Sequence, residues 1–495
     1  MSSSAASLRS GLTIALGRAA RLAARLRGGG SGGTALPGLV MEKTDPGFLR
    51  RTLDQLPLGV VVVSGTNGKT TTTKMVVELL TAQGLKVLTN RTGSNFVRGV
   101  LASLLTEVDA VGRLDADVAV LELDEAHAVR FVRRVRPRAA LLLNVMRDQL
   151  DRFGEIDYTA SLLHKVAAAT TDVVVVNADD PRLSGPAFFE GVRARTAAFG
   201  AGPGLRSLFV SDDDLRTGAA QAEEARREAP QAGADRAEDP EAEQAEQTGQ
   251  SEQAGPGGST TSAAPETSPE TSTPPAPRVS LQSLSGQDAV VRVDGADHDI
   301  AFAIPGIHNQ LNACAALAVA LETLGDRADL AGLLTTLARV QAAFGRGEIL
   351  TLDGRDVQLS LVKNPAGFRM GLLTAAEAVR AGGPESVMIA INDEYADGRD
   401  MSWLWDVEFA GLRDEGVAVV TGVRAWDMAL RLRYDEVPIG TVEPDLTRAV
   451  ALLRQAASAA DDGAGRPMRI FTTYTAMLAL RAHLAELTDV EEALT

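Results

Sequence analysis

The chain has 495 residues, of which 45% are hydrophobic, and it carries a formal net charge of −16 at pH 7. This length suits two or three globular domains with sizeable cores, and nothing in the charge pattern points to nucleic-acid binding. A single cysteine excludes an internal disulfide and any metal site built from several cysteines, which fits a reducing cytoplasm.

The first element is an Arg- and Ala-rich segment, 8–27, whose leucines recur at helical spacing before the Gly-rich run 28–33. The segment lacks the continuous apolar stretch of a secretory signal. No apolar run in the chain approaches the roughly 20 residues that span a bilayer. We therefore predict an amphipathic helix and linker over residues 1–45, with a membrane-surface contact as a secondary interpretation.

The most informative stretch is a β-branched run, 60–63, followed by the turn Gly65-Thr66-Asn67-Gly68 and then by Lys69-Thr70-Thr71. Such a strand, turn and helix hold a nucleotide phosphate, because backbone N–H groups of the loop and of the helix start face the anion. Lys69 supplies a mobile charge, and the Thr70 hydroxyl can bind Mg²⁺. A strict Walker A pattern would have glycine at position 63, so an ordinary Gly turn is the alternative interpretation.

The following apolar runs alternate with helical patterns and predict a mainly parallel sheet: 58–63, 117–123, 139–144 and 172–177. A second series predicts another α/β unit, joined to the first near residues 345–348: 357–362, 387–392, 417–421 and 469–473.

Carboxylates follow the strand ends of the first series, where open α/β sheets bind ligands. Glu122 is our first choice to complete a Mg²⁺ site with Thr70, since Mg²⁺ prefers hard oxygen ligands. We expect neither Lys69 nor Glu122 to lie in the core. Asp124 and Glu125 can be read equally as solvated turn residues or as functional ones. Asp148 and Asp151 are three apart and can share a helix side, either for function or as ion-pairing residues.

The segment 211–277 interrupts the first series and holds fifteen Asp and Glu against four Arg, a net charge of −11. It consists largely of Ala, Glu, Gln, Pro, Ser, Thr and Gly, with almost no residue able to form a core. We predict a disordered, solvated insertion without chemistry.

Asn309 and Asn312 stand at i and i+3 of a predicted helix start. Their amides can read an adenine edge, although Asn309 alone would also serve as an N-cap. Cys314 follows in an apolar helical context, which favours a buried, inert thiol.

Four motifs occur in the order typical of the Mur ligase central domain: Gly65–Thr71, Asn177-Ala178-Asp179-Asp180-Pro181, Gly306-x-His308-Asn309-x-x-Asn312 and Gly345-Arg346-x-Glu348. Residues 89–95, 147–155, 363–367 and 392–406 make the chain similar, within that family, to the MurT group. The resemblance runs from about residue 36 to the C-terminus, except for the insertion. It implies an α/β fold: a Mur ligase-like central ATP-binding parallel-sheet domain, 46–345, interrupted by 211–277, and a Rossmann-like α/β C-terminal domain, 346–495.

The resemblance also implies an activity. MurT proteins are ATP-dependent carbon–nitrogen ligase subunits of lipid II isoglutaminyl synthases in peptidoglycan biosynthesis. They activate the α-carboxylate of D-glutamate in the lipid II stem peptide as an acyl phosphate. Ammonia from a GatD-like glutamine amidotransferase subunit then gives D-isoglutamine. The implied cofactors are ATP and Mg²⁺, and the implied setting is a cytoplasmic heterodimer, with a place at the inner membrane face as a secondary interpretation. The alternatives are a stand-alone Mur or folylpolyglutamate-type amino acid ligase and a non-catalytic nucleotide-binding scaffold.

The family roles carry over to matching positions. The implied ATP-binding residues are Gly65, Thr66, Asn67, Gly68, Lys69, Thr70, Thr71, Asn309, Asn312 and Arg346, and the implied Mg²⁺ ligands are Thr70 and Glu122. Asp400 matches the aspartate that MurT proteins lend to the partner's Cys–His pair. As an alternative, Asp397, Asp400 and Asp406 cap the following helix while Trp403 and Trp405 pack.

The chain also departs from the family pattern. MurT proteins can carry a four-Cys zinc ribbon, and the corresponding segment here is Cys-free, so we expect no zinc. Gln149 stands where amino-acid-adding ligases have a histidine, and Lys165 is about two positions from their carbamylated lysine, so that lysine's role is not carried over. Amino-acid-adding ligases hold the incoming amino acid with a C-terminal domain, which here carries Lys363-Asn364-Pro365 and the Asp400 loop instead. This last departure favours ammonia over an amino acid as the nucleophile.

Overall fold

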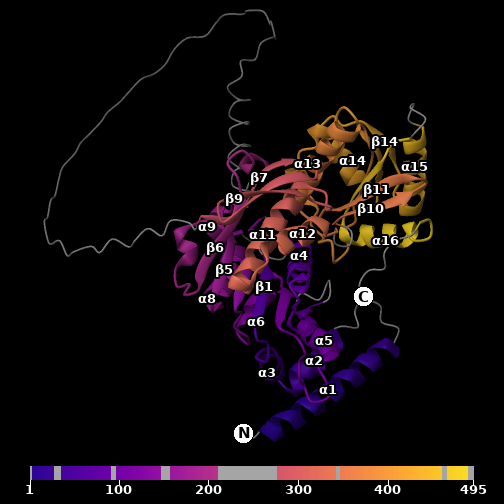
Figure 1. The fold of residues 1–495 in the computed structure, drawn as a ribbon. Coiled ribbons are helices and arrows are strands. Elements are labelled where there is room, and N and C mark those ends of the chain that lie inside the picture. The colour runs from indigo at the N-terminus through magenta and orange to yellow at the C-terminus, as the bar shows by residue number, and fades with distance from the viewer. Residues whose placement is uncertain are drawn as a thin grey trace, which may run out of the picture. The chain divides into compact units, whose positions relative to one another are not determined.

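The computed structural model describes residues 3–26, 35–90, 96–146, 156–209, 276–341, 346–459 and 465–488. Two sheets organise them, one formed before residue 302 and one after residue 345 (Figure 1). The predicted insertion 211–277 lies outside the described residues except for its last two positions, and Pro277 is already the first residue of a strand. Asp148, Gln149 and Asp151 also lie outside them.

The first sheet has nine strands in the order β2-β3-β1-β4-β5-β6-β7-β8-β9. Neighbours from β2 to β7 are parallel, and β8 and β9 extend the sheet in antiparallel fashion. The prediction of a mainly parallel sheet is confirmed. Its strands are β1 (Val60–Ser64), β2 (Val87–Thr89), β3 (Val118–Glu122), β4 (Ala139–Leu142), β5 (Val173–Asn177), β6 (Arg195–Ala201), β7 (Pro277–Ser285), β8 (Asp288–Val293) and β9 (Ala296–Ala301).

Helices cover both faces of this sheet, so its central strands are continuous apolar runs. Val61 and Val63 of β1 point into a core shared with α4 (Lys69–Ala82), α11 (Ile307–Leu324) and α12 (Leu330–Arg339). Val60 and Val62 point into a second core on the opposite face. That core is built with α1 (Ser3–Leu26), α2 (Ala35–Thr44), α3 (Phe48–Leu53), α5 (Val97–Glu107), α6 (Glu125–Val132) and α8 (Ile156–Ala169).

Helix α11 is buried along almost its whole length, and its many alanines let it lie close against α4 and the sheet. Cys314 on this helix is fully buried, as predicted. Burial in an apolar core raises the pKa of its thiol to about 12, so the thiolate is not available near neutral pH.

The second sheet has six strands in the order β10-β11-β15-β12-β13-β14. Only the β10–β11 pair is antiparallel. The four predicted runs correspond to β11 (Arg355–Leu361), β12 (Ser386–Ala390), β13 (Val417–Thr421) and β15 (Met468–Thr472), and the sheet also contains β10 (Arg346–Leu352) and β14 (Ile439–Val442).

Two apolar cores flank the second sheet as well. Its helices are α13 (Pro365–Gly382), α14 (Ala425–Tyr434), α15 (Leu446–Ser458) and α16 (Tyr474–Leu484), with a short 3-10 turn, η5 (Ser402–Asp406). The described part of the chain contains no helix that is both long and apolar enough to cross a bilayer.

Candidate functional site

The turn between β1 and α4 requires glycine at two positions. Gly65 has φ +132° and Gly68, the N-cap of α4, has φ +84°. A Cβ on Gly68 would lie 2.7 Å from Oδ1 of Asn312, and one on Gly65 would lie 3.0 Å from the backbone nitrogen of Asn144. No side chain caps α4, so the N–H groups of its first turn face outward as an anion site does.

Lys69 is folded back beneath this turn. Its Nζ donates to the carbonyl oxygen of Gly65 at 2.6 Å and lies 3.4 Å from Oδ1 of Asp124 and 3.9 Å from Oε1 of Glu125. The sequence left open whether Asp124 and Glu125 are solvated turn residues or functional ones. Both lie against Lys69, which favours a role at the site. Glu125 is buried, at 3% exposure, and is not a solvated turn residue.

Thr70 and Glu122 meet as predicted, because β3 lies beside β1 and ends level with the turn. Oγ1 of Thr70 donates to Oε1 of Glu122 at 2.9 Å. The strand end is fixed by Asn90, whose amide accepts from the Glu122 N–H at 2.9 Å and donates to the Glu122 carbonyl at 2.8 Å. Asn90 was not singled out from the sequence, although it lies in the 89–95 motif.

The expectation that Lys69 and Glu122 lie outside the core is wrong. Lys69 is 7% exposed and Glu122 is 6% exposed. Glu122 is enclosed because it ends β3 beside the first turn of α4, where it accepts from Thr70. Lys69, the first residue of α4, is enclosed because its side chain folds back toward Gly65, Asp124 and Glu125. Their charges are compensated locally, by Asp124 and Glu125 for Lys69 and by the Thr70 hydroxyl for Glu122.

The loop after β4 braces the turn from its other side. Oδ1 of Asn144 accepts from the N–H of Asn67 at 2.8 Å, and its amide nitrogen donates to the Asn67 carbonyl at 3.1 Å. Thr66 makes a similar exchange with the backbone of Met146. These contacts fix the turn Gly65-Thr66-Asn67-Gly68, hereafter the phosphate turn after the role predicted for it, without a ligand. Such preorganisation is what a phosphate site needs.

Asp180, from the 177–181 motif, supports that brace. One carboxylate oxygen accepts from the N–H of Val145 at 2.6 Å, and the other caps the short helix α9 (Pro181–Ser184) through Arg182 and Leu183. Burial raises the pKa of Asp180 to about 6, although these backbone donors oppose the rise. Asp180 therefore positions the loop after β4.

Helix α11 carries both predicted amide residues, but only Asn312 lies against the turn in the contacts described. Asn312 lies against Gly68, as the close approach above shows. Asn309 is not an N-cap, because Gly306 holds that place, and its amide donates to the Pro305 carbonyl at 2.6 Å. The Asn309 side chain also lies close to Gly347, where an added Cβ would be 3.9 Å from Nδ2 of Asn309. The side chain of Arg346 lies outside what the structure describes.

Two residues from the second sheet also reach the turn. After β11, Nζ of Lys363 donates to the Thr66 carbonyl at 3.1 Å. Asn364 and Asn67 exchange amide hydrogen bonds at 3.0 and 3.3 Å, while Asn364 also caps α13 through the N–H of Gly367. The sequence marked 363–367 only as a family motif, and nothing local in it revealed this contact.

Asp400 is exposed. One of its carboxylate oxygens accepts from the N–H of Ser402 at 2.9 Å, just before η5, whose N-cap is Met401. Asp397 is buried and accepts from the N–H of Thr475 at 2.7 Å, which ties the loop to the start of α16. Trp403 packs in the core, whereas Trp405 is 49% exposed.

The Asp400 loop and the Lys363–Asn364 pair nonetheless share one edge of the second sheet. The pair follows β11 and the loop follows β12, and both strands run parallel to β15 between them. Because the carboxyl ends of parallel strands meet at one edge, both segments lie at the edge that faces ligands in such folds.

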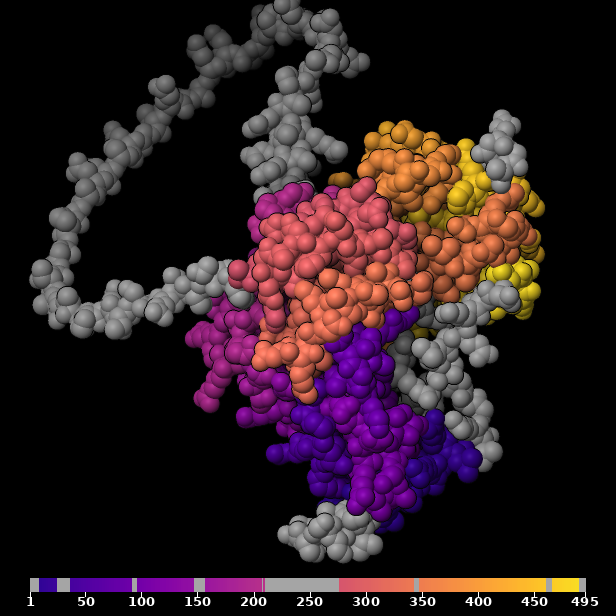
Figure 2. Space-filling model, in the orientation of Figure 1, coloured from indigo at the N-terminus to yellow at the C-terminus, as the bar shows by residue number. Residues whose placement is uncertain are grey.

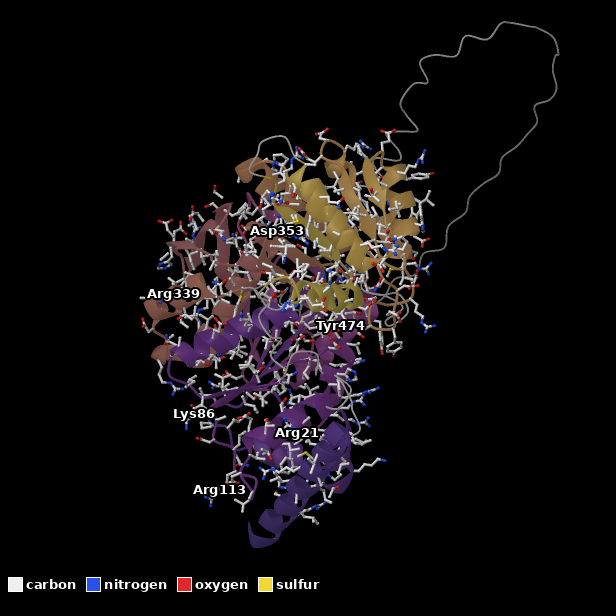
Figure 3. The ribbon with its side chains drawn as sticks, turned by 90° about the vertical axis from the view of Figure 1, so that its right-hand side faces the viewer. Arg21, Lys86, Arg113, Arg339, Asp353 and Tyr474 are labelled. Carbon is white, nitrogen blue, oxygen red and sulfur yellow. The ribbon has the colours of Figure 1, made fainter. Side chains whose placement is uncertain are left out.

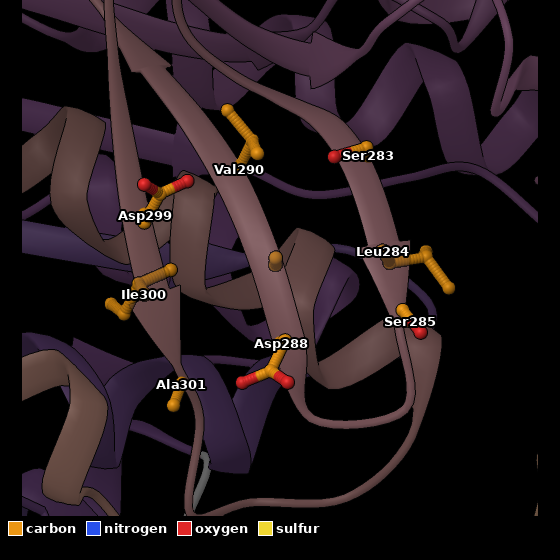
Figure 4. Close-up of a pocket in the computed structure, with 9 residues that line it drawn as sticks. Ser283, Leu284, Ser285, Asp288, Val290, Asp299, Ile300 and Ala301 are labelled. Atoms are coloured by element: carbon orange, nitrogen blue, oxygen red, sulfur yellow. The ribbon is translucent and has the colours of Figure 1, made fainter. Parts of the chain in front are cut away.

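A separate hollow lies on the antiparallel extension β7–β9, and its carboxylates are Asp288 and Asp299 (Figure 4). None of the residues that line it is basic. It therefore does not suit phosphate. Its lining consists of Ser283, Leu284, Ser285, Asp288, Ala289, Val290, Asp299, Ile300 and Ala301.

Comparison with known proteins supplies the context for this geometry. Residues 63–216 match the Mur ligase middle domain and residues 361–477 match the MurT ligase C-terminal domain. The chain is 29% identical to the lipid II isoglutaminyl synthase subunit MurT of Streptococcus pneumoniae over 92% of both chains. It is 28% identical to that of Staphylococcus aureus strain COL over 90% of this chain and 92% of the relative.

Among solved structures, MurF ligase of Thermotoga maritima in complex with ADP matches with a TM-score of 0.59 at 16% identity. The match covers 91% of this chain and 84% of that one. Likeness at this identity establishes the fold and confirms the expected α/β Mur ligase architecture.

Proposed function

The chain belongs to the MurT group of the Mur ligase family, and we propose that it amidates the α-carboxylate of D-glutamate in the lipid II stem peptide. In this proposal the carboxylate attacks the γ-phosphorus of ATP, ADP leaves, and ammonia displaces phosphate from the acyl phosphate to give D-isoglutamine. A glutaminase partner subunit of the GatD type supplies the ammonia. The relatives are named as subunits, which supports a partner.

One observation carries the ligase part of the proposal: the hydroxyl of Thr70 meets Glu122 directly beside the uncapped start of α4 and the buried Lys69. A hydroxyl and a carboxylate are hard oxygen ligands suited to Mg²⁺, which also binds phosphate oxygens. Glycine at position 68 lets the Asn312 amide approach the turn, since a Cβ there would lie 2.7 Å from its Oδ1. The residues present therefore fit MgATP, and bound Mg²⁺ would neutralise charge on the transferred phosphoryl group.

The Lys69 ammonium group already lies beside the proposed phosphate site in this structure. Its ion pair with Asp124 and its bond to the Gly65 carbonyl keep the ammonium buried and close to the turn. A phosphate at the start of α4 would compete with Asp124 for that charge. Asp124 and Glu125 thus keep Lys69 oriented, and the preorganised charge stabilises phosphoryl transfer without costly rearrangement.

The chain offers no nucleophilic thiol for glutamine hydrolysis. Its only cysteine is fully buried in α11 with a raised pKa. A glutaminase of the Cys–His type needs an accessible thiolate beside a base. Ammonia must accordingly come from solution or from a second chain.

An exposed apolar patch, hereafter the α14 patch, suits such a second chain. Four of its side chains are more than half exposed, and they belong to Val423, Trp426, Leu430 and Tyr434. Trp405 continues the patch onto η5, since its ring lies 5.3 Å from that of Tyr434 and the Arg431 guanidinium stacks 5.4 Å from it. Exposed aromatic residues with arginine are typical of interface centres.

The α14 patch and Asp400 lie on neighbouring stretches of the chain, because η5 begins two residues after Asp400. A partner seated on the α14 patch would have Asp400 at its margin. In that position a carboxylate can fix the tautomer of the partner's catalytic histidine and stabilise its cation. Ammonia would be released at the sheet edge where Lys363 and Asn364 contact the phosphate turn.

The decisive experiment is mass spectrometry of lipid II after incubation with the chain, the co-expressed glutaminase, ATP, Mg²⁺ and either glutamine or ammonium. We expect a product 1 Da lighter, as conversion of a carboxylic acid to an amide requires. Incorporation of an amino acid would instead identify a stand-alone ligase. Absence of both turnover and ATP hydrolysis with the complex assembled would identify a scaffold.

Two variants separate docking from catalysis. Asp400→Asn should abolish glutamine-driven amidation while the complex assembles and ammonium-driven amidation persists at high ammonium. Trp426→Ala should weaken assembly and leave the ammonium-driven reaction intact. If both activities fall together in Asp400→Asn, the residue serves the ligase site or the fold. If neither falls, the partner's histidine is oriented by another group.

A further inference from the structure

Helix α1 packs on the protein with its small and polar face. The residues of that face are Ser10, Thr13, Ile14 and Gly17, all of them buried. At Gly17 an added Cβ would lie 2.9 Å from Cγ of Met41 and 3.1 Å from Cδ1 of Leu105, so α2 and α5 approach the α1 backbone closely. The helix is therefore docked firmly on the first domain.

The opposite face of α1 is apolar and exposed. Leu12 is 59% exposed, Leu16 41% and Leu22 60%, and the alanines between them, Ala15, Ala19 and Ala23, are exposed as well. Their spacing of three and four residues places them on a single stripe. This is the reverse of an ordinary surface helix, which turns its leucines inward. Residues near the N-terminus form part of the molecular surface in Figure 2.

The charge on α1 has one sign. Residues 1–30 contain five arginines, Arg9, Arg18, Arg21, Arg25 and Arg27, and no aspartate or glutamate, although the whole chain has a net charge of −16. Arg18 donates to the Val108 carbonyl at 3.2 Å, which holds its guanidinium beside the stripe. Arg21 lies one turn further along the same helix (Figure 3).

We propose that α1 lies in the plane of an anionic lipid surface and docks the protein on it. In this arrangement the stripe Leu12–Leu16–Leu22 enters the boundary between head groups and acyl chains, and Arg18 beside the stripe contacts lipid phosphates, while Arg9 stays paired with Asp45 at 3.4 Å. Arg side chains suit that boundary, because their apolar stems can lie along acyl chains while the guanidinium reaches the head groups.

The observations favour lipid over a second copy of the chain. Two copies joined through this stripe would bring arginines from both helices together with no acidic residue on either α1 to compensate them, and like charges at an interface are costly. An anionic bilayer supplies both missing parts, an apolar layer and negative charge. The inference goes beyond the proposed function, since it requires no catalysis, and a lipid-linked substrate would lie in the same surface.

The test is vesicle flotation with the full chain. Phosphatidylcholine vesicles are compared with vesicles that contain about 30% phosphatidylglycerol, at low salt and at about 1 M NaCl. We expect flotation only with the anionic vesicles, and a loss on the order of tenfold in bound fraction at high salt, where the Debye length falls to about 3 Å.

The double variant Leu12→Gln/Leu16→Gln should lose flotation while keeping the far-UV circular dichroism and thermal midpoint of the parent, since both side chains are exposed. The matched control is Leu478→Gln on α16, which has the same 41% exposure as Leu16 and should float as the parent does. Flotation that is unchanged in the double variant, or equal on neutral vesicles, overturns the proposal. The proposal is also overturned if light scattering shows that the parent is a dimer and the double variant a monomer, while the parent does not bind vesicles.

Discussion

At the scale of single residues, the phosphate turn depends on charges that are buried yet paired. Lys69 begins α4 and Glu122 lies beside its second residue, Thr70, and each has its own compensating group. The two residues differ in what their removal leaves behind. Loss of Glu122 frees only the Thr70 hydroxyl, whereas loss of Lys69 leaves the buried Glu125 without its cation.

We therefore expect Glu122→Gln and Lys69→Ala each to lower ATP-dependent amidation on the order of 10²-fold, because each removes charge that serves phosphoryl transfer. Only Lys69→Ala should also lower the free energy of unfolding, by a few kcal/mol. Steady-state amidation and urea denaturation measure the two effects. Near-normal turnover in either variant would mean that ATP binds elsewhere.

Asp180 makes a pH-dependent contribution to stability. Its folded-state pKa is raised to about 6, above the ordinary aspartate value of 3.8, because burial disfavours the carboxylate. The folded state thus holds the proton more tightly than the unfolded state, and the contribution of Asp180 to stability is lost as pH rises through about 6.

Asp180→Asn removes this titration. The difference in unfolding free energy between parent and variant should shift in favour of the variant by roughly 1 kcal/mol between pH 5.5 and 8. Urea denaturation at several pH values checks it. A constant difference across that range would show that the three backbone donors to Asp180 keep it ionised throughout.

At the scale of elements, α13 joins a structural role to the site. Asn364 is the N-cap of this helix and also exchanges hydrogen bonds with Asn67 of the phosphate turn. The start of α13 is therefore placed by the same side chain that contacts the turn, so our proposal couples helix capping and nucleotide binding at one residue.

The matched control is Asp445, which caps α15 through the N–H of Arg448 at 2.9 Å. The hydrogen bond described for Asp445 lies within its own helix start and does not involve the phosphate turn. Asn364→Ala and Asp445→Ala should each cost about 1 kcal/mol of stability as lost caps. Only Asn364→Ala should also lower kcat/KM for ATP, roughly tenfold, the equivalent of one hydrogen bond. Equal kinetic effects in the two variants would show that Asn364 serves only as a helix cap.

At the scale of the whole molecule, ligase chemistry and nitrogen supply are divided between chains in our proposal. The chain holds an uncapped phosphate turn, a second sheet that contacts that turn, and an exposed aromatic surface, but its one thiol is sealed in α11. The purified chain should amidate lipid II with ammonium and fail with glutamine until the partner is added. Product formation and glutamate release, assayed separately, check this. Glutamine hydrolysis by the chain alone would contradict it.

The sequence by itself determined the parts of the site that are local in the chain. The strand, Gly turn and helix over 60–71 follow from backbone preferences within a dozen residues, since β-branched residues favour the strand and only glycine readily adopts the positive φ of the turn. The pairing of Thr70 with Glu122 was also predictable, because parallel strands present their carboxyl ends at one edge. The short strand β2 and the polar strand β9 have weak periodicity, and they were not predicted.

Only the tertiary structure decided which distant residues complete that site. Lys363 and Asn364 reach the turn from almost 300 positions away, Glu125 is buried against Lys69, and α1 turns its leucines outward. Each of these depends on which surface packs against which, and the periodicity of α1 does not tell which of its faces is buried. Periodicity records only that a face is apolar; the close approach of Met41 and Leu105 to Gly17 selects the face that is buried.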